Sequence, residues 1–171
     1  QQLLRVDQEE ICDKKDARCL LKGVVAKVHS CKVVVISDYF KGVILDISTI
    51  VKEAAKYSIP VIVDPKSSNL ESYRSAFLIT PNLKEFRAFS CFDPTMSIYE
   101  NAVLLSKRFD IKWIVVTMGA QGLLAVNKDG ESYQVDSSCK EVIDVTGAGD
   151  TVIALIGLML ALKFSVDESI E

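Results

Sequence analysis

The sequence has little of the residue patterns that point to metal or redox chemistry. It has a single histidine, His29, and its five cysteines are odd in number, with no Cys-x-x-Cys spacing among them. The cysteines therefore predict neither a disulfide framework nor a zinc site. Free cysteines of this kind are typical of a reducing cytoplasm, where each is most often a small buried hydrophobic residue. We expect His29, which lies between a predicted helix and a predicted strand, to be structural.

Charge and hydrophobicity exclude two further classes of partner. The formal net charge is only −3, and the lysines and arginines are scattered, so the chain has no general attraction to nucleic acid. The longest apolar run, Val152 to Leu162, is too short to span a bilayer, and no signal peptide is visible. We expect a cytoplasmic protein that binds neither nucleic acid nor a membrane.

Two common nucleotide-binding loops are also absent or disfavoured. No P-loop of the pattern G-x-x-x-x-G-K-[ST] occurs anywhere in the chain. A Rossmann site is disfavoured because Val152 stands where the third glycine of G-x-G-x-x-G is expected. In addition, Asp167 and Glu168 follow the next helix without an intervening strand.

What remains is the composition of a globular domain. The chain has 171 residues, of which 49% are hydrophobic and 25% are charged. A chain of this length is one domain or part of one, and it buries roughly two thirds of its unfolded surface. It begins without methionine in what reads as a strand and ends as another helix begins. We therefore expect a fragment of a longer domain.

The hydrophobic pattern alternates between short β-branched runs and segments of helical period. Such runs are typical of parallel strands covered by helices on both faces, and they predict an α/β fold. The last two strands flank an Asp-Gly turn and predict an antiparallel hairpin. The predicted strands are 1–7, 32–37, 61–63, 77–79, 113–116, 123–126 and 132–135. The predicted helices are 17–28, 46–57, 83–89, 97–109 and 151–162, the last of them buried.

Polar residues follow the predicted strands at their carboxyl ends, which is the edge of an open α/β sheet where ligands bind. We expect these residues to converge on one site together with the loop around Gly147: Asp38, Lys66, Asn82, Glu85 and Thr117.

The stretch from Asp144 to Thr151 is the most informative part of the chain. Gly147 and Gly149 leave the backbone free to adopt φ > 0 and to present peptide N–H groups to an anion. The loop precedes an apolar helix, whose N-terminus also favours negative charge. Asp150 would repel that anion unless it takes a proton from an attacking hydroxyl. The combination suits phosphoryl transfer to an alcohol.

Simpler explanations stand beside each of these assignments. The glycine loop could be an ordinary one, with Asp150 a favourable charge in the first helical turn. Asn82 could be only a helix N-cap with Glu85 as its capping-box partner. Lys66 could be a solvated lysine, and Trp113, at the start of a strand, is expected in the core.

The stretch Asp-Val-Thr-Gly-Ala-Gly-Asp-Thr at 144–151 resembles the carboxyl-terminal signature of the ribokinase and phosphofructokinase B sugar kinase family. Thr-Pro-Asn-Leu-Lys-Glu at 80–85 resembles its N-x-x-E motif. Residues 1–7, 37–42 and 64–66 resemble the branch that phosphorylates heptose 7-phosphate, which in many bacteria is fused to a nucleotidyltransferase domain. The resemblance covers essentially the whole chain.

The resemblance implies a role for each matching residue. Asp150 would be the base, and Gly147, Ala148 and Gly149 would form the anion hole. Asn82 and Glu85 would hold Mg²⁺, mostly through water. Asp144 would brace the loop and help to form a monovalent-cation (K⁺) site. The implied ATP contacts are Lys66, Asn82, Glu85, Thr117, Gly119 and Gly122, and the implied sugar contacts are Asp38 and Lys41.

The resemblance also implies an architecture. The chain would be a partial kinase domain over residues 1–171, with a ribokinase-like three-layer α/β/α fold, a mostly parallel central sheet, and incomplete termini. The missing parts would leave half a sugar pocket, and so weak or no kinase activity. They would also leave an exposed sheet edge at which two copies could pair. Two alternatives stay open: another kinase of the family, acting on a different sugar or a nucleoside, and a nucleotide-binding protein without turnover.

Overall fold

The structure is a computed structural model that describes residues 12–39, 43–44, 46–137 and 147–170. The predicted strand at 1–7, the predicted sugar contact Lys41 and the predicted cation ligand Asp144 lie outside the described residues. None of the helices in the described part of the chain has the length and apolar character that a membrane span requires.

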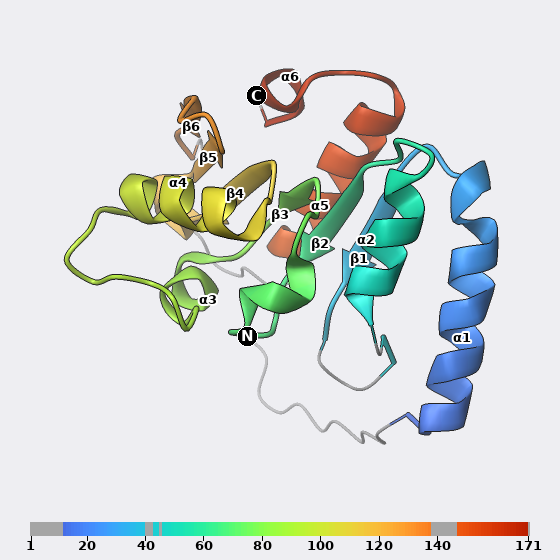
Figure 1. The fold of residues 1–171 in the computed structure, drawn as a ribbon. Coiled ribbons are helices and arrows are strands. Elements are labelled where there is room, and N and C mark those ends of the chain that lie inside the picture. The colour runs from blue at the N-terminus through green and yellow to red at the C-terminus, as the bar shows by residue number, and fades with distance from the viewer. Residues whose placement is uncertain (1–11, 40–42, 45, 138–146, 171) are drawn as a thin grey trace, which may run out of the picture.

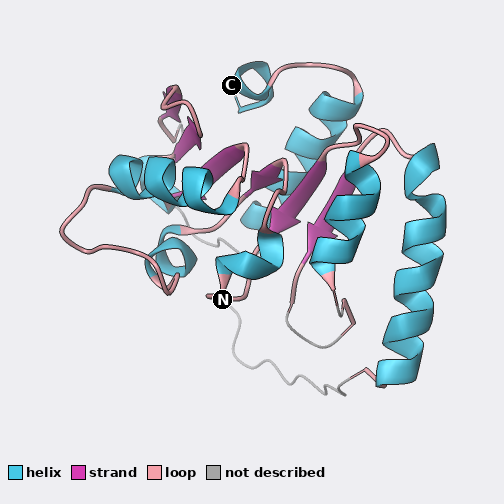
Figure 2. Ribbon diagram, viewed as in Figure 1, coloured by secondary structure: helices cyan, strands magenta, loops and turns pink. Residues whose placement is uncertain are grey.

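One six-stranded sheet forms the centre of the molecule (Figure 2), and its strands lie in chain order. The first four strands are parallel, and the last two form the predicted antiparallel hairpin. The mostly parallel α/β sheet is thus confirmed. The strands are β1 (Val34–Ser37), β2 (Val61–Asp64), β3 (Leu78–Ile79), β4 (Trp113–Thr117), β5 (Leu123–Asn127) and β6 (Ser132–Val135).

Each predicted helix is present, with ends set by local capping. The first begins three residues before its predicted start because the Asp13 carboxylate accepts a hydrogen bond from the Lys15 N–H at 3.0 Å. The helices are α1 (Lys14–Lys27), α2 (Ile47–Ala55), α3 (Leu83–Arg87), α4 (Ile98–Phe109), α5 (Ala148–Ala161) and α6 (Val166–Ile170). Three short 3₁₀ helices were not predicted: η1 (Val28–Ser30), η2 (Leu70–Tyr73) and η3 (Gly119–Gln121).

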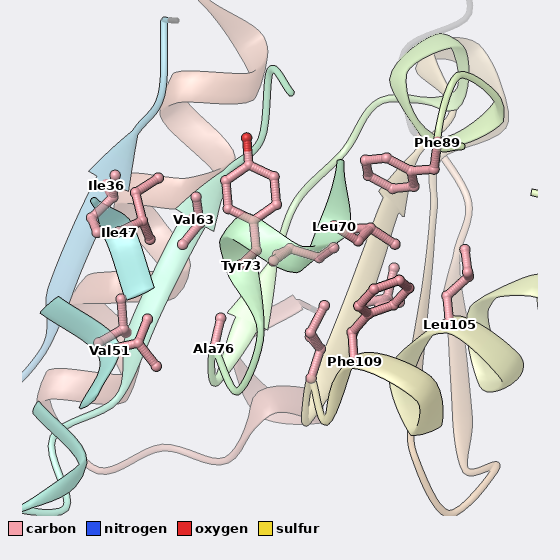
Figure 3. Close-up of a cluster of buried hydrophobic side chains, with 14 of the residues drawn as sticks. Ile36, Ile47, Val51, Val63, Leu70, Tyr73, Ala76, Phe89, Leu105 and Phe109 are labelled. Carbon is pink, nitrogen blue, oxygen red and sulfur yellow. The ribbon is translucent and has the colours of Figure 1, made fainter. Parts of the chain in front are cut away.

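The central strands β2 to β4 are buried on both faces, as parallel strands require. Alternate residues along β2 to β4 enter two separate cores. Val63, Ile114 and their neighbours pack against α2 and α4 on one face, as part of the cluster in Figure 3. Ile62, Val115 and their neighbours pack against α5 and α6 on the other. Figure 1 shows α2 and α5 on opposite sides of the strands, which gives the three layers expected from the sequence.

The prediction that the 151–162 helix is wholly buried is wrong. Ile153 and Ile156 face the sheet and are buried, whereas Leu155, Leu158 and Leu162 are 53%, 57% and 58% exposed. Within the described residues α5 contacts the sheet along one side only, so the opposite apolar stripe faces outward. The uniform hydrophobicity of this helix carries no amphipathic period from which the outward face could have been read.

The turn between β4 and β5 depends on a glycine. Gly122 has φ of +80°, and a Cβ atom added there would overlap the Val135 carbonyl oxygen and lie 2.9 Å from the Asp136 Cα. These are backbone atoms of the segment at the end of β6, so the overlap cannot be relieved by moving one side chain.

We predict that Gly122→Ala lowers the free energy of unfolding by about 3 kcal/mol, because strained φ and overpacking each cost 1–3 kcal/mol. Gly23→Ala is the matched control. Gly23 lies inside α1 with no atom within 4 Å of an added Cβ, so alanine there should stabilise by about 0.5–1 kcal/mol. Urea unfolding measures both, and equal effects of the two substitutions would contradict the assignment.

Candidate active site

A cavity of about 620 Å³ opens at the carboxyl ends of the parallel strands and the N-terminus of α5. This is the edge of the sheet at which the sequence predicts convergence, and most of the predicted site residues line it. The predicted residues in the lining are Lys66, Asn82, Glu85, Thr117, Gly119, Gly122, Gly147, Gly149 and Asp150. Of the residues predicted to converge there, only Asp38 is absent from the described lining.

Strand register explains why the residues meet. Ser37 at the end of β1 pairs with Asp64 at the end of β2. Beyond β3 the chain continues in a parallel bridge between Asn82 and Thr117, and the Thr117 N–H donates to the Pro81 carbonyl oxygen at 3.0 Å. β1 and β2 therefore end at the same level, and the chain that follows β3 runs beside the end of β4, so the residues at these four strand ends meet at one edge of the sheet.

Lys66 lies between two carboxylates in this cavity. Its ammonium nitrogen is 2.7 Å from Glu85 Oε1 and 3.2 Å from Asp64 Oδ2. Burial pulls the pKa of Lys66 down, but the hydrogen bond to Glu85 and the charge of Asp64 more than offset it, so the pKa lies above its ordinary value. The lysine is therefore a fixed cation and not a freely moving surface residue.

Burial raises the pKa of Asp64 above its ordinary value, because the side chain is almost completely removed from water. The charge and hydrogen bond of Lys66 oppose this rise, and the negative charges of Glu85 and Asp150 add to it. The cavity thus holds interacting carboxylates on β2, α3 and α5 around one lysine.

Asn82 and Glu85 form the capping box that the simpler explanation predicts. The Glu85 N–H donates to Asn82 Oδ1 at 2.9 Å, and the Asn82 N–H donates to Glu85 Oε2 at 3.0 Å. The other oxygen of Glu85 accepts from Lys66. Both residues also line the cavity, so the capping role does not remove them from the site.

Helix α5 begins at Ala148 and not at Thr151 as predicted. Its N-cap Gly147 has φ of +80°, and the first residue to donate to it is Thr151, whose N–H is 2.9 Å from the Gly147 carbonyl oxygen. The N–H groups of residues 148–150 precede that bond and have no acceptor inside the helix. N–H groups that have no acceptor inside the helix favour an anion at the helix start.

Asp150 lies in the first turn of α5 and lines the cavity, with its carboxylate exposed to solvent. The Tyr39 hydroxyl, from the segment after β1, lies 3.2 Å from Asp150 Oδ2 and 3.4 Å from Oδ1. The predicted base therefore faces the same space as Lys66, beside the helix N-terminus.

Asp38, predicted as a sugar contact, does not line the cavity. It is buried with 8% exposure, and its Oδ2 accepts a hydrogen bond from the Tyr73 hydroxyl at 2.7 Å. Its role toward the sugar stays a prediction, and the structure gives it a second one. Trp113 is buried in the core as expected, with its ring 5.9 Å from that of Tyr133.

Several lining residues were not predicted as site residues. Asp64 is the last residue of β2, a position at which the rule for strand ends could have found it. Thr80 follows β3, and its buried Oγ1 has no hydrogen-bond partner in the part of the chain that the structure describes. Tyr39 follows β1 by two residues and Asp136 directly follows β6, so the same rule could have found both.

The described lining is strongly acidic. Lys66 is its only cation, against four carboxylates: Asp64, Glu85, Asp136 and Asp150. No group of three or more metal-ligating side chains that could hold an ion on its own occurs among the described residues. An anionic ligand would therefore enter this cavity most readily together with its own counter-cation.

Comparison with known proteins identifies the family of this chain. The sequence pattern of the pfkB family carbohydrate kinases matches residues 8–171. The chain belongs to the pfkB carbohydrate kinase family. Its relatives include the bifunctional protein HldE of Vibrio parahaemolyticus, at 36% identity over 170 residues, and that of Haemophilus influenzae, at 37% over 171 residues. Each alignment covers 99% of this chain but 36% of the relative, so the chain spans about a third of their length.

Solved structures agree on the fold. Arabidopsis thaliana ribokinase in complex with ribose and ATP superimposes with a TM-score of 0.71 and 19% identity, covering 85% of this chain and 48% of that one. Phosphofructokinase-2 of Escherichia coli in complex with fructose-6-phosphate gives a TM-score of 0.71 at 23% identity, covering 96% and 55%. The ribokinase-like fold expected from the sequence is confirmed.

We predict that Lys66→Met raises the pKa of Asp64 further, because the substitution removes the positive charge that now opposes the effect of burial. A pH titration of the Asp64 carboxyl carbon by NMR measures the change. Lys128→Met, which removes a lysine paired with Asp110 at 3.7 Å and outside the cavity lining, should leave it unchanged. A lower pKa of Asp64 in Lys66→Met would contradict the geometry.

The raised pKa of Asp64 also makes the stability of the fold depend on pH. The pKa of Asp64 is higher in the folded chain than in the unfolded chain, where it is about 3.9. Between these two values the unfolded chain has already lost the proton, so this carboxyl group makes the fold less stable as pH rises through the window. In Lys66→Met the window should extend to higher pH, which the free energy of unfolding measured against pH will show.

Proposed function

We propose that this chain is the nucleotide-binding and catalytic part of an ATP-dependent sugar kinase. The observation that carries the proposal is that Asp150 and the N-terminus of α5 face the same cavity as Lys66, Asn82, Glu85 and Thr117. A carboxylate, an anion-binding helix start and a fixed lysine are what phosphoryl transfer to a hydroxyl requires. Membership of the pfkB carbohydrate kinase family supports the same reaction.

In the proposed reaction Asp150 accepts the proton of the sugar hydroxyl. The hydroxyl oxygen forms a bond to the γ-phosphorus of ATP, the bond from that phosphorus to the bridging oxygen breaks, and ADP leaves with that electron pair. A carboxylate is a weak base toward an alcohol, so Asp150 would accept the proton only as the hydroxyl becomes acidic in the transition state. Such assistance is typically worth about 10²–10⁴-fold. The Tyr39 hydroxyl contacts the same carboxylate and limits its rotation.

The anion hole is proposed at Gly147, Ala148 and Gly149. Gly147 takes the left-handed conformation that starts the helix, and a Cβ atom added at Gly149 would meet no atom within 4 Å. The peptide N–H groups there would face the transferring phosphoryl group with no side chain between them. Donors directed at developing negative charge are worth about 10²–10³-fold each.

The nucleotide phosphates are proposed to contact Lys66 and Thr117, with backbone approach at Gly119 and Gly122. Asn82 and Glu85 would hold Mg²⁺, mostly through water, and the bound ion would offset the charge of the phosphates. The donors fit this use: they are oxygen atoms, Thr80 Oγ1 is unpartnered among the described residues, and the lining is too acidic for a bare polyphosphate. The proposed Asp144 and K⁺ contribution falls on a residue outside the described ones.

The substrate proposed is heptose 7-phosphate, which would give heptose 1,7-bisphosphate. The support is the identity of 34–37% to proteins named HldE, together with the stretches at 37–42 and 64–66. Because those relatives are named bifunctional, we also propose that the natural polypeptide carries a nucleotidyltransferase domain. Residues 1–171 are then part of the kinase domain, with Asp38 and Lys41 on its sugar side. As a separate chain they would leave a sheet edge uncovered, and we propose that two copies pair there.

We predict that Asp150→Asn lowers sugar-dependent ADP production from Mg-ATP at least a hundredfold, because the base is lost while the side chain keeps its shape. The assay uses heptose 7-phosphate and the full-length protein. Asp129→Asn is the matched control, since Asp129 is an exposed aspartate in the hairpin turn, outside the cavity lining. Thermal unfolding of both variants checks that the fold is intact.

Other results of this assay would contradict the mechanism, the substrate or the kinase function itself. Full activity of Asp150→Asn would refute the mechanism. Activity on a different sugar or a nucleoside would keep the family and refute the heptose assignment. Nucleotide binding without sugar-dependent ADP release would indicate a binding protein without turnover, and ADP release without any sugar would indicate a hydrolase.

A further inference from the structure

Tyr73 is the largest fully buried side chain of the described residues, and it belongs to a segment for which the sequence predicted no element. It ends η2, in the connection between β2 and β3. Figure 3 shows its ring among apolar side chains such as Val63, Leu70 and Ala76, while its hydroxyl oxygen points away from that cluster. A buried hydroxyl needs hydrogen-bond partners.

The Tyr73 hydroxyl uses all of its hydrogen-bonding capacity. It donates to Asp38 Oδ2 at 2.7 Å, and it accepts from the backbone N–H of Lys66 at 3.2 Å and of Ser67 at 2.9 Å. A phenolic oxygen has one donor and two acceptor positions, so none is left over. The direction of the first bond is fixed, because burial and the hydrogen bond to Asp38 hold the pKa of Tyr73 well above its ordinary value.

These contacts join two strand ends through one atom. Asp38 directly follows β1, and Lys66 follows β2 by two residues. The backbone of Lys66 is held by Tyr73 from below, and its ammonium group is held by Asp64 and Glu85 in the cavity. The lysine is thus fixed at both ends of its side chain.

We propose that Tyr73 is a positioning residue that fixes Lys66 for contact with the phosphates of the nucleotide, by bonding the turn at residues 66 and 67 to Asp38. This inference rests on the proposed function for the identity of the ligand. Tyr73 then has two roles. Its ring stabilises the fold, and its hydroxyl sets the position of Lys66, which lines the cavity although Tyr73 does not.

A double-mutant cycle on Mg-ATP affinity tests the proposal. Tyr73→Phe removes only the hydroxyl, and we expect it to weaken Mg-ATP binding by about tenfold, as measured by calorimetry. In the Lys66→Ala background the same substitution should cause less than a twofold further loss, because the group that Tyr73 positions is gone. Tyr99→Phe is the matched control: it also removes one hydroxyl bond, to the Gly130 carbonyl oxygen at 2.8 Å, and should leave affinity unchanged.

A second measurement does not depend on any ligand. Amide hydrogen exchange should be at least tenfold faster at Lys66 and Ser67 in Tyr73→Phe than in the wild type, and unchanged there in Tyr99→Phe. A purely structural role would instead raise exchange throughout the core and weaken binding equally with and without Lys66. Additive losses in the cycle, or unchanged exchange at these two amides, would overturn the proposal. If the wild-type protein does not bind Mg-ATP, the proposed function fails, and the exchange measurement still decides whether Tyr73 holds the turn.

Discussion

The parallel pairing of β1 to β4 is the constraint on which the site depends. Parallel strands are joined by crossovers and must be covered on both faces, so their interiors are apolar. Polar residues can then occur only where the strands end. Because the four strands run in one direction, the polar residues at and beyond their carboxyl ends are brought to one edge of the sheet. Along β2, the alternation of side chains places Ile62 and Val63 in opposite cores, and Asp64, at the end of the strand, lines the cavity.

The electrostatics of this edge follow from that convergence. Several strand ends deliver carboxylates, and only one of them delivers a lysine among the described lining residues. The ammonium group of Lys66 therefore forms ion pairs with Asp64 and Glu85. The start of α5 adds attraction for an anion without adding charge, because its first N–H groups, which have no acceptor inside the helix, carry only the partial charges of peptide dipoles. A cavity of this kind admits a polyphosphate when a divalent cation enters with it.

Much of the fold could be predicted from periodicity and capping. The β-branched runs predicted the strands, and the helical period of residues 97–109 predicted α4, which begins at Ile98 because Ser97 is its N-cap. The site was predicted where chemistry follows a strand directly, as at Asn82, Glu85 and Thr117. It was missed where the relevant contact is made across the fold. Tyr73 meets Asp38 across 35 positions and Tyr39 meets Asp150 across 111, and no local pattern encodes either pair.

The exposed stripe on α5 shows a different limit. The exposed residues Leu155, Leu158 and Leu162 are as hydrophobic as the residues on the buried side of the helix. Hydrophobicity alone therefore could not distinguish the exposed side from the buried side. Gly157 marks the inner side, since a Cβ atom added there would lie 2.8 Å from Val35 Cγ2. Close packing against the sheet, and not the hydrophobic pattern, determines which face of this helix is inside.

Asn82 and Glu85 show that a structural and a functional explanation of one motif need not compete. A capping box uses one oxygen of each side chain. Glu85 has a second oxygen, which accepts from Lys66. The capping box holds the Glu85 side chain in one orientation, so that its second oxygen faces the cavity and accepts from Lys66. Because the lysine is already ordered, its ordering adds little entropy cost when a ligand binds. Helix capping is then the means by which the site is prepared, and the N-x-x-E spacing serves the start of α3 and the cavity through the same two side chains.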